Sequence, residues 1–133
     1  MASVQSGNSV VVSYPALINL SDYQYYPVTL TTSSTYPDGA ITTIGSTATK
    51  PLGVLQDTPD AAGVMGSVII DGPSKVVAYS GTINALDALG VGADSIAAVT
   101  TTDNRWVIGT AMESVTDDGA NGVIEANIAV GRY

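Results

Sequence analysis

Alternating apolar and polar residues near the end of the chain give the clearest structural signal. In Val123–Val130 every second residue from Ile124 onward is apolar, and the residues between them include Glu125 and Asn127. A period of two is typical of a strand with one buried face. Another apolar run, Arg105–Val115, precedes it, and the connection between the two contains Asp-Gly and Asn-Gly. These dipeptides favour tight turns, so the sequence predicts a β-hairpin.

The middle of the chain predicts further strands separated by glycine and proline. Val64–Asp71 and Ser74–Ser80 are rich in apolar residues and flank Gly72-Pro73, which we interpret as the connection between two strands. Thr31–Gly39 and Thr42–Lys50 are rich in Ser and Thr. We expect these two segments to form loops or weak edge strands, with a Pro-Asp-Gly turn in the first of them.

One segment has a helical pattern. Ile83, Leu86 and Leu89 recur at a spacing of three residues, after Thr82 as a candidate N-cap and before Gly90 as a stop. The pattern predicts a helix of at most two turns.

Composition favours β structure throughout. The chain has 133 residues and contains sixteen valines, ten isoleucines and fifteen threonines, against seven leucines and no phenylalanine. Branching at Cβ restricts side chains in helices and suits the pleated surface of a sheet. We therefore predict an all-β fold: an N-terminal arm or strand (residues 1–20) and one compact β-rich domain (residues 21–133) with a short helix and a soft boundary near residue 50.

Charge limits the classes of partner. The net charge is −8, and residues 51–133 carry −7 of it. Such a chain repels phosphate backbones and anionic lipid surfaces, so we expect neither nucleic acid nor membrane as a partner. The N-terminus shows no basic and apolar pattern of a secretory signal, and the absence of cysteine fits synthesis in a reducing cytoplasm.

The residue types also limit the chemistry. Without histidine or cysteine, Ser-His and Cys-His catalysis and ordinary zinc sites are excluded. Ser74 and Lys75 are neighbours on a predicted strand and should point to opposite faces. Asp57 and Asp60 lie in a turn-like Pro/Gly context, and the calcium-loop pattern that begins at Asp117 lacks its required final glutamate. We expect no enzyme activity, no cofactor and no metal site.

Aromatic residues are the remaining candidates for recognition. Trp106 lies within an apolar run, where a single tryptophan more often belongs to the core. Tyr23, Tyr25 and Tyr26 are clustered in sequence. Tyrosine is enriched at protein interfaces, so these three residues are a candidate interface, the alternative being that they cover a small core.

A succession of short motifs resembles the head-decoration, or capsid cement, proteins of tailed bacteriophages. The family pattern is a Pro-x-Gly-Val strand, a short Asp/Ala/Gly loop, a valine-rich strand, a Gly-x-x-Asp turn, a Gly-x-Ala-Met-Glu strand and a final hairpin. The corresponding segments are Pro51–Val54, Asp60–Gly63, Val64–Ile70, Gly90–Asp94, Gly109–Glu113 and Asp117–Val130. The Tyr-rich and Ser/Thr-rich stretch from Asp22 to Thr49 departs from this pattern.

The resemblance implies a β-barrel or β-tulip domain, similar to the lambda-type decoration protein. Members form trimers at three-fold and local three-fold positions outside the capsid, where they bind the major capsid protein and stabilise the head against internal DNA pressure. Strand edges and apolar surface that need cover also favour a homotrimer. The implied location is the outer capsid surface of a virion, after synthesis in the cytoplasm of a bacterial host.

Two further expectations concern recognition. The uncharged N-terminal segment could add as a strand to a sheet of the capsid protein, with Val4, Val10, Val11, Val12 and Tyr14 as contact residues. The alternative is that Ser9–Tyr14 is an ordinary strand of the domain. An alternative function is a phage or bacterial surface binding module, such as a fibre or carbohydrate-binding domain, that uses Trp106 and the tyrosines as a platform.

Overall fold

The computed structural model describes residues 9–46, 48–78, 82–91, 97–99, 105–115 and 122–132. All regular secondary structure elements in these ranges are β-strands. This result confirms the mainly β fold. The nine strands are β1 (Val10–Pro15), β2 (Pro27–Thr31), β3 (Ala40–Thr42), β4 (Gly53–Leu55), β5 (Met65–Ala78), β6 (Ala88–Val91), β7 (Ala97–Val99), β8 (Trp106–Ala111) and β9 (Gly122–Arg132).

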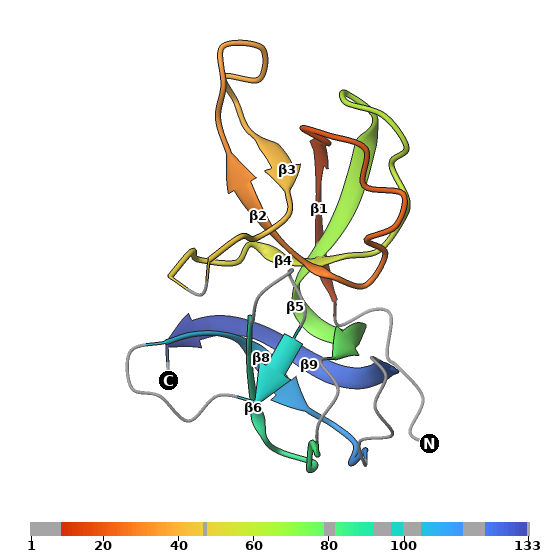
Figure 1. The fold of residues 1–133 in the computed structure, drawn as a ribbon, viewed down its shortest axis with the longest axis vertical. Coiled ribbons are helices and arrows are strands. Elements are labelled where there is room, and N and C mark those ends of the chain that lie inside the picture. The colour runs from red at the N-terminus through yellow and green to blue at the C-terminus, as the bar shows by residue number, and fades with distance from the viewer. Residues whose placement is uncertain are drawn as a thin grey trace.

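The long strand β5 organises the molecule into two lobes (Figure 1). Its first half pairs with β1 and β4 in the upper lobe of the view, together with the β2–β3 hairpin. Its second half pairs with β9 over eight residues in the lower lobe, which also contains β6 and β8. A single strand therefore contributes to both lobes and changes partners halfway along its length.

The expected break at Gly72-Pro73 is wrong. Both residues lie inside β5 and are paired with Ile128 and Asn127 of β9. Gly72 has a φ of 111°, which glycine adopts without the steric cost of a side chain. The backbone can therefore bend here while pairing continues, and proline needs no partner for an N–H that it lacks.

The predicted helix is also wrong. Ile83 forms an antiparallel bridge with Val115, and the Asp87 N–H donates to the Asn84 carbonyl across a turn. Leu89 then lies buried in β6. Pairing with the segment after β8 satisfies backbone groups that a two-turn helix would leave largely unpaired. Among the described residues no helix is long and apolar enough to cross a membrane.

Two clusters of buried residues form the core. The upper cluster contains Leu20, Val28, Ile41, Leu55 and Val68. The lower and larger cluster is built mainly on β5, β6, β8 and β9, and its buried members include Val76, Leu89, Ile108, Ile124 and Ile128.

The predicted antiparallel pairing of the two C-terminal strands is confirmed, whereas residues 116–121 of their connection lie outside the described residues. β8 and β9 are antiparallel, and Ile124, Ala126 and Ile128 are buried while Val123 and Asn127 are exposed. The alternation in the sequence therefore identified the buried face of this strand correctly.

The N-terminal run Val10–Pro15 pairs with β5 of the same chain. Val12 and Tyr14 pack against the upper cluster, whereas Val10 and Val11 are both about half exposed. The pairing register shifts between Val10 and Val11, where Ile70 of β5 has no partner in β1. Val4 lies outside the described residues, and contact of this strand with a capsid stays a prediction.

Candidate functional site

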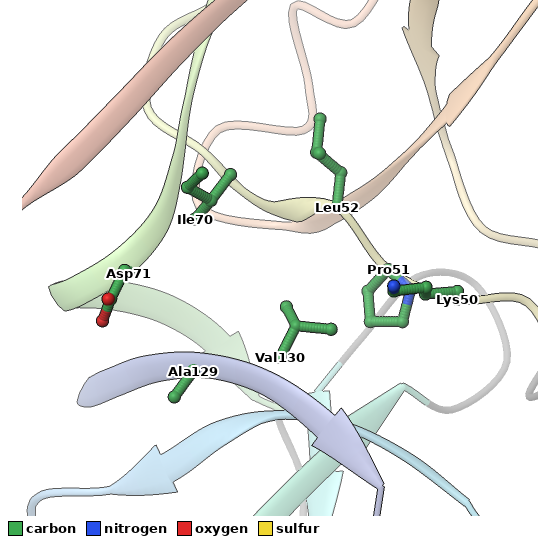
Figure 2. A pocket seen from close by; sticks show the side chains of 7 residues that line it. All are labelled: Lys50, Pro51, Leu52, Ile70, Asp71, Ala129 and Val130. Atoms are coloured by element: carbon green, nitrogen blue, oxygen red, sulfur yellow. The ribbon is translucent and has the colours of Figure 1, made fainter.

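A hollow lies between the two lobes (Figure 2). It has a volume of about 410 Å³ and is lined by three separate segments: Lys50–Leu52 before β4, Ile70-Asp71 of β5, and Ala129-Val130 of β9. Val130 points into it from β9, and Lys50 and Asp71 lie on opposite sides of the view. The sharp change of partners along β5 separates the lobes at this point and leaves the space between them.

The lining is mostly apolar. Lys50 and Asp71 are the charged members, and both are exposed. A second hollow of about 450 Å³ shares Lys50, Pro51 and Leu52 and continues toward Thr29 and Leu30 of β2. Together the two hollows form a shallow groove across the middle of the molecule. An apolar groove with a charge at each side is suited to holding a side chain or an extended segment of a protein.

Lys50 has a second role at this groove. Its Nζ atom lies 5.2 Å from the centroid of the Trp106 ring, which joins the segment before β4 to the start of β8 by a cation–π contact. The Thr29 hydroxyl donates to the Lys50 carbonyl over 2.8 Å and fixes the backbone. One side of the half-buried Trp106 ring therefore faces an ammonium group, which competes with a sugar ring for stacking on that side.

The three candidate tyrosines are half-buried. The rings of Tyr23 and Tyr26 meet edge to face with centroids 5.1 Å apart. Tyr23 packs against the upper cluster and Tyr25 against the lower one, where the Lys75 ammonium lies 5.8 Å from the Tyr25 ring. These contacts support a role in covering the core. A role in an interface stays a prediction.

The polar residues that the sequence offered for catalysis have structural partners. Ser74 is buried, donates to the Lys75 carbonyl and accepts a hydrogen bond from the Gln56 side chain, whereas the Lys75 side chain is exposed on the other face. The Asp57 carboxylate accepts the Ser67 N–H at 3.1 and 3.2 Å and so links the loop to β5. No Ser-Lys dyad is assembled from Ser74 and Lys75.

The sequence also raised the question of a metal site. The calcium-loop pattern from Asp117 to Asn121 falls outside the described residues. Within the described part of the chain, no group of three or more carboxylate, histidine or cysteine side chains is placed to hold a metal ion.

Sequence reasoning did not identify the groove. Its residues come from positions 50–52, 70–71 and 129–130, and no local pattern joins them. The change in composition near Lys50-Pro51 was the available signal, and it marked the segment between β3 and β4 that lines this groove.

Comparisons with known proteins give information about the fold. No protein-family model matches the sequence, and no curated protein matches it. Among solved structures, the chain is similar to the N base of the head fibre gp8.5 of bacteriophage phi29, with a TM-score of 0.64 and 20% sequence identity. The similarity covers 91% of this chain and 94% of that chain. At this level of identity the likeness concerns the fold, and it supports the mainly β architecture over almost the whole length.

Proposed function

We propose that this chain is a structural protein of a tailed-phage head, which binds the outside of the capsid. The observation that carries the proposal is the shared fold with a phage head-fibre base over 91% of the chain. The motifs from Pro51 to Val130 that resemble capsid decoration proteins point to the same location by an independent route. A chain without histidine or cysteine, whose candidate catalytic residues hold structural hydrogen bonds, is suited to binding rather than to turnover.

The finer proposal is a cement protein. Three copies bind at the three-fold and local three-fold positions, contact the major capsid protein and hold neighbouring capsid subunits together. The start of β1, where Val10 and Val11 are both exposed, is one surface available for this contact. The interlobe groove is another, because it offers apolar surface bounded by Lys50 and Asp71.

A second function is favoured by the comparison itself. The similar structure is described as the N base of a head fibre, so we propose as this second function an attachment base that carries another element on the capsid. Both functions require binding to the head. They differ in whether binding strengthens the shell.

Heads prepared from a phage deleted for this gene distinguish these functions. Purified chain is added, and binding is measured by co-sedimentation and by cryo-electron microscopy. The cement function predicts trimeric density at three-fold positions and a higher temperature of DNA release. Bound density without any change in that temperature favours the attachment base. Absence of binding to both expanded and unexpanded heads contradicts the head-protein proposal. Light scattering at tens of micromolar checks the trimer.

A further inference from the structure

Leu86 occupies a backbone position that favours glycine. The Asp87 N–H donates to the Asn84 carbonyl over 3.0 Å, which closes a four-residue turn with Leu86 third, and its φ is 76°. A positive φ at that position is typical of a type II turn, where glycine is the preferred residue.

The hydrogen bonds to β8 reinforce this preference. The Leu86 N–H donates to the Ala111 carbonyl over 2.7 Å, and the Ala111 N–H donates to the Asp87 carbonyl over 2.9 Å. Two residues thus face one, in the pattern of a G1 bulge, whose first residue is normally a glycine with positive φ. Leucine is disfavoured here by the turn and by the bulge.

Within the described part of the chain, the Leu86 side chain gains little burial that would offset this strain. The Leu86 side chain is 78% exposed, the highest value among the exposed large apolar residues of the described chain. Tyr25 is the other described non-glycine residue with positive φ, and its ring packs against the lower core. A strained backbone that presents an apolar side chain to solvent points to a contact made outside the domain.

Two neighbouring side chains extend the apolar surface. Met112 and Val123 are 55% and 51% exposed. The Met112 N–H donates to the Glu125 carbonyl, and Val123 lies two residues from Glu125 on the same face of β9. Because Leu86 bonds to Ala111, the residue before Met112, the three segments lie side by side. We call Leu86, Met112 and Val123 the anchor patch.

An acidic residue lies close in sequence to each residue of the anchor patch. Asp87 follows Leu86, and its side chain accepts the Asn84 N–H over 2.8 Å. Glu113 follows Met112, and its side chain accepts the Glu125 N–H over 3.0 Å. Lys75 lies opposite Glu125 in the register of β5 and β9, and its ammonium lies 5.8 Å from the centroid of the Tyr25 ring. Asp87, Glu113 and Glu125 therefore leave the surroundings of the patch acidic.

This charge distribution distinguishes between two possible binding partners of the anchor patch, a second copy of the chain and a different protein. Two copies that met through the same patch would bring like charges together. A head-to-tail contact between copies would need a basic rim elsewhere on this chain, which has four basic residues, and two of these, Lys50 and Lys75, already lie over its own Trp106 and Tyr25 rings. The complementary surface is an apolar depression with a rim of lysine or arginine on a different protein.

We propose that the anchor patch docks into such a basic-rimmed apolar depression on another protein of the head, an inference that rests on the proposed head location. Leu86 enters the depression, where the burial of its side chain offsets the backbone strain. The three carboxylates orient the domain by pairing with the basic rim.

The test uses full-length Leu86→Asn and Met112→Ser, with Met65→Ser as the matched control. Asparagine tolerates a positive φ, so the first variant keeps the turn and removes the apolar side chain. Met65 lies in the upper lobe at the start of β5 and is 56% exposed, against 55% for Met112. Each protein is added to heads that lack the chain, and bound protein is measured by co-sedimentation at low and high salt.

We expect Leu86→Asn and Met112→Ser to weaken binding at least about tenfold, as the loss of one buried apolar side chain implies. Met65→Ser should bind like the wild type, and wild-type binding should weaken as salt rises. Thermal midpoints of all variants should stay at or above the wild-type value.

Variants with wild-type affinity would overturn the inference while leaving the head location intact, whereas a wild-type chain that does not bind heads contradicts the head location itself. If Leu86→Asn instead dissociates an oligomer in sedimentation velocity, the occupant is a second copy and the inference is wrong.

Discussion

The Lys50 ammonium lies 5.2 Å from the centroid of the Trp106 ring and so connects the segment before β4 to the lower lobe. Because Trp106 is the single tryptophan of the chain, its fluorescence reports this contact directly. We expect Lys50→Gln to change the emission of the folded protein and to lower the free energy of unfolding by about 0.5–1 kcal/mol, the usual size of an exposed cation–π contact. Urea denaturation followed by fluorescence and by circular dichroism measures both effects.

Lys75→Gln is the matched control, because Lys75 makes a similar contact with Tyr25 at 5.8 Å. It should leave Trp106 emission unchanged. An equal spectral change in both variants would contradict a direct contact between Lys50 and Trp106.

Asp57 links its loop to β5 through the Ser67 N–H. We expect Asp57→Asn to keep one acceptor for this N–H and to cost less than ~2 kcal/mol of stability, as for a residue with a turn or capping role. Asp60 is exposed, and Asp60→Asn should cost less. Chemical denaturation measures both. A folded Asp57→Asn protein that no longer binds heads would show that the carboxylate acts in recognition rather than in structure.

The sequence was sufficient where local pattern decides the structure. The alternation in Val123–Val130 predicted the buried face of β9, and the Asp-Gly and Asn-Gly connection predicted the hairpin with β8. The pattern failed where distant pairing decides the structure. Ile83, Leu86 and Leu89 have helical spacing, but pairing with β8 places Ile83 in a bridge, Leu86 in a turn and Leu89 in a strand.

The candidate sites were less accessible to sequence reasoning. Gly72-Pro73 is a common signal for a chain break, and it cannot reveal that β5 continues and changes partners there. The groove depends on that change, since its lining comes from three segments that β5 and β9 bring together. The strain at Leu86 depends on its φ value, which the sequence does not predict because leucine is disfavoured at positive φ.

Gly109 allows β8 to approach β9 closely. A Cβ atom added at Gly109 would lie 2.1 Å from the Asn127 carbonyl oxygen, which belongs to the backbone of β9. Gly109→Ala therefore requires the two strands to separate, and we expect a loss of about 1–3 kcal/mol or more of stability from overpacking. Gly131→Ala is the matched control on β9, because a Cβ at Gly131 meets no atom within 4 Å. Thermal denaturation compares the two variants, and equal midpoints would contradict the close approach.

The last prediction concerns strand β1. Six residues, Val10–Pro15, pair with β5, and Val12 and Tyr14 pack against the upper core. We expect deletion of Ala2–Tyr14 to lower the thermal midpoint and expose the upper core, because the edge of β5 loses its backbone partners and the core loses two side chains. Deletion of Ala2–Asn8 leaves β1 in place and is the reference. Differential scanning calorimetry and binding of a hydrophobic dye measure the difference. If both truncated proteins keep the wild-type midpoint but the longer deletion alone abolishes binding to heads, β1 contributes little to the domain and its main role is contact with the capsid.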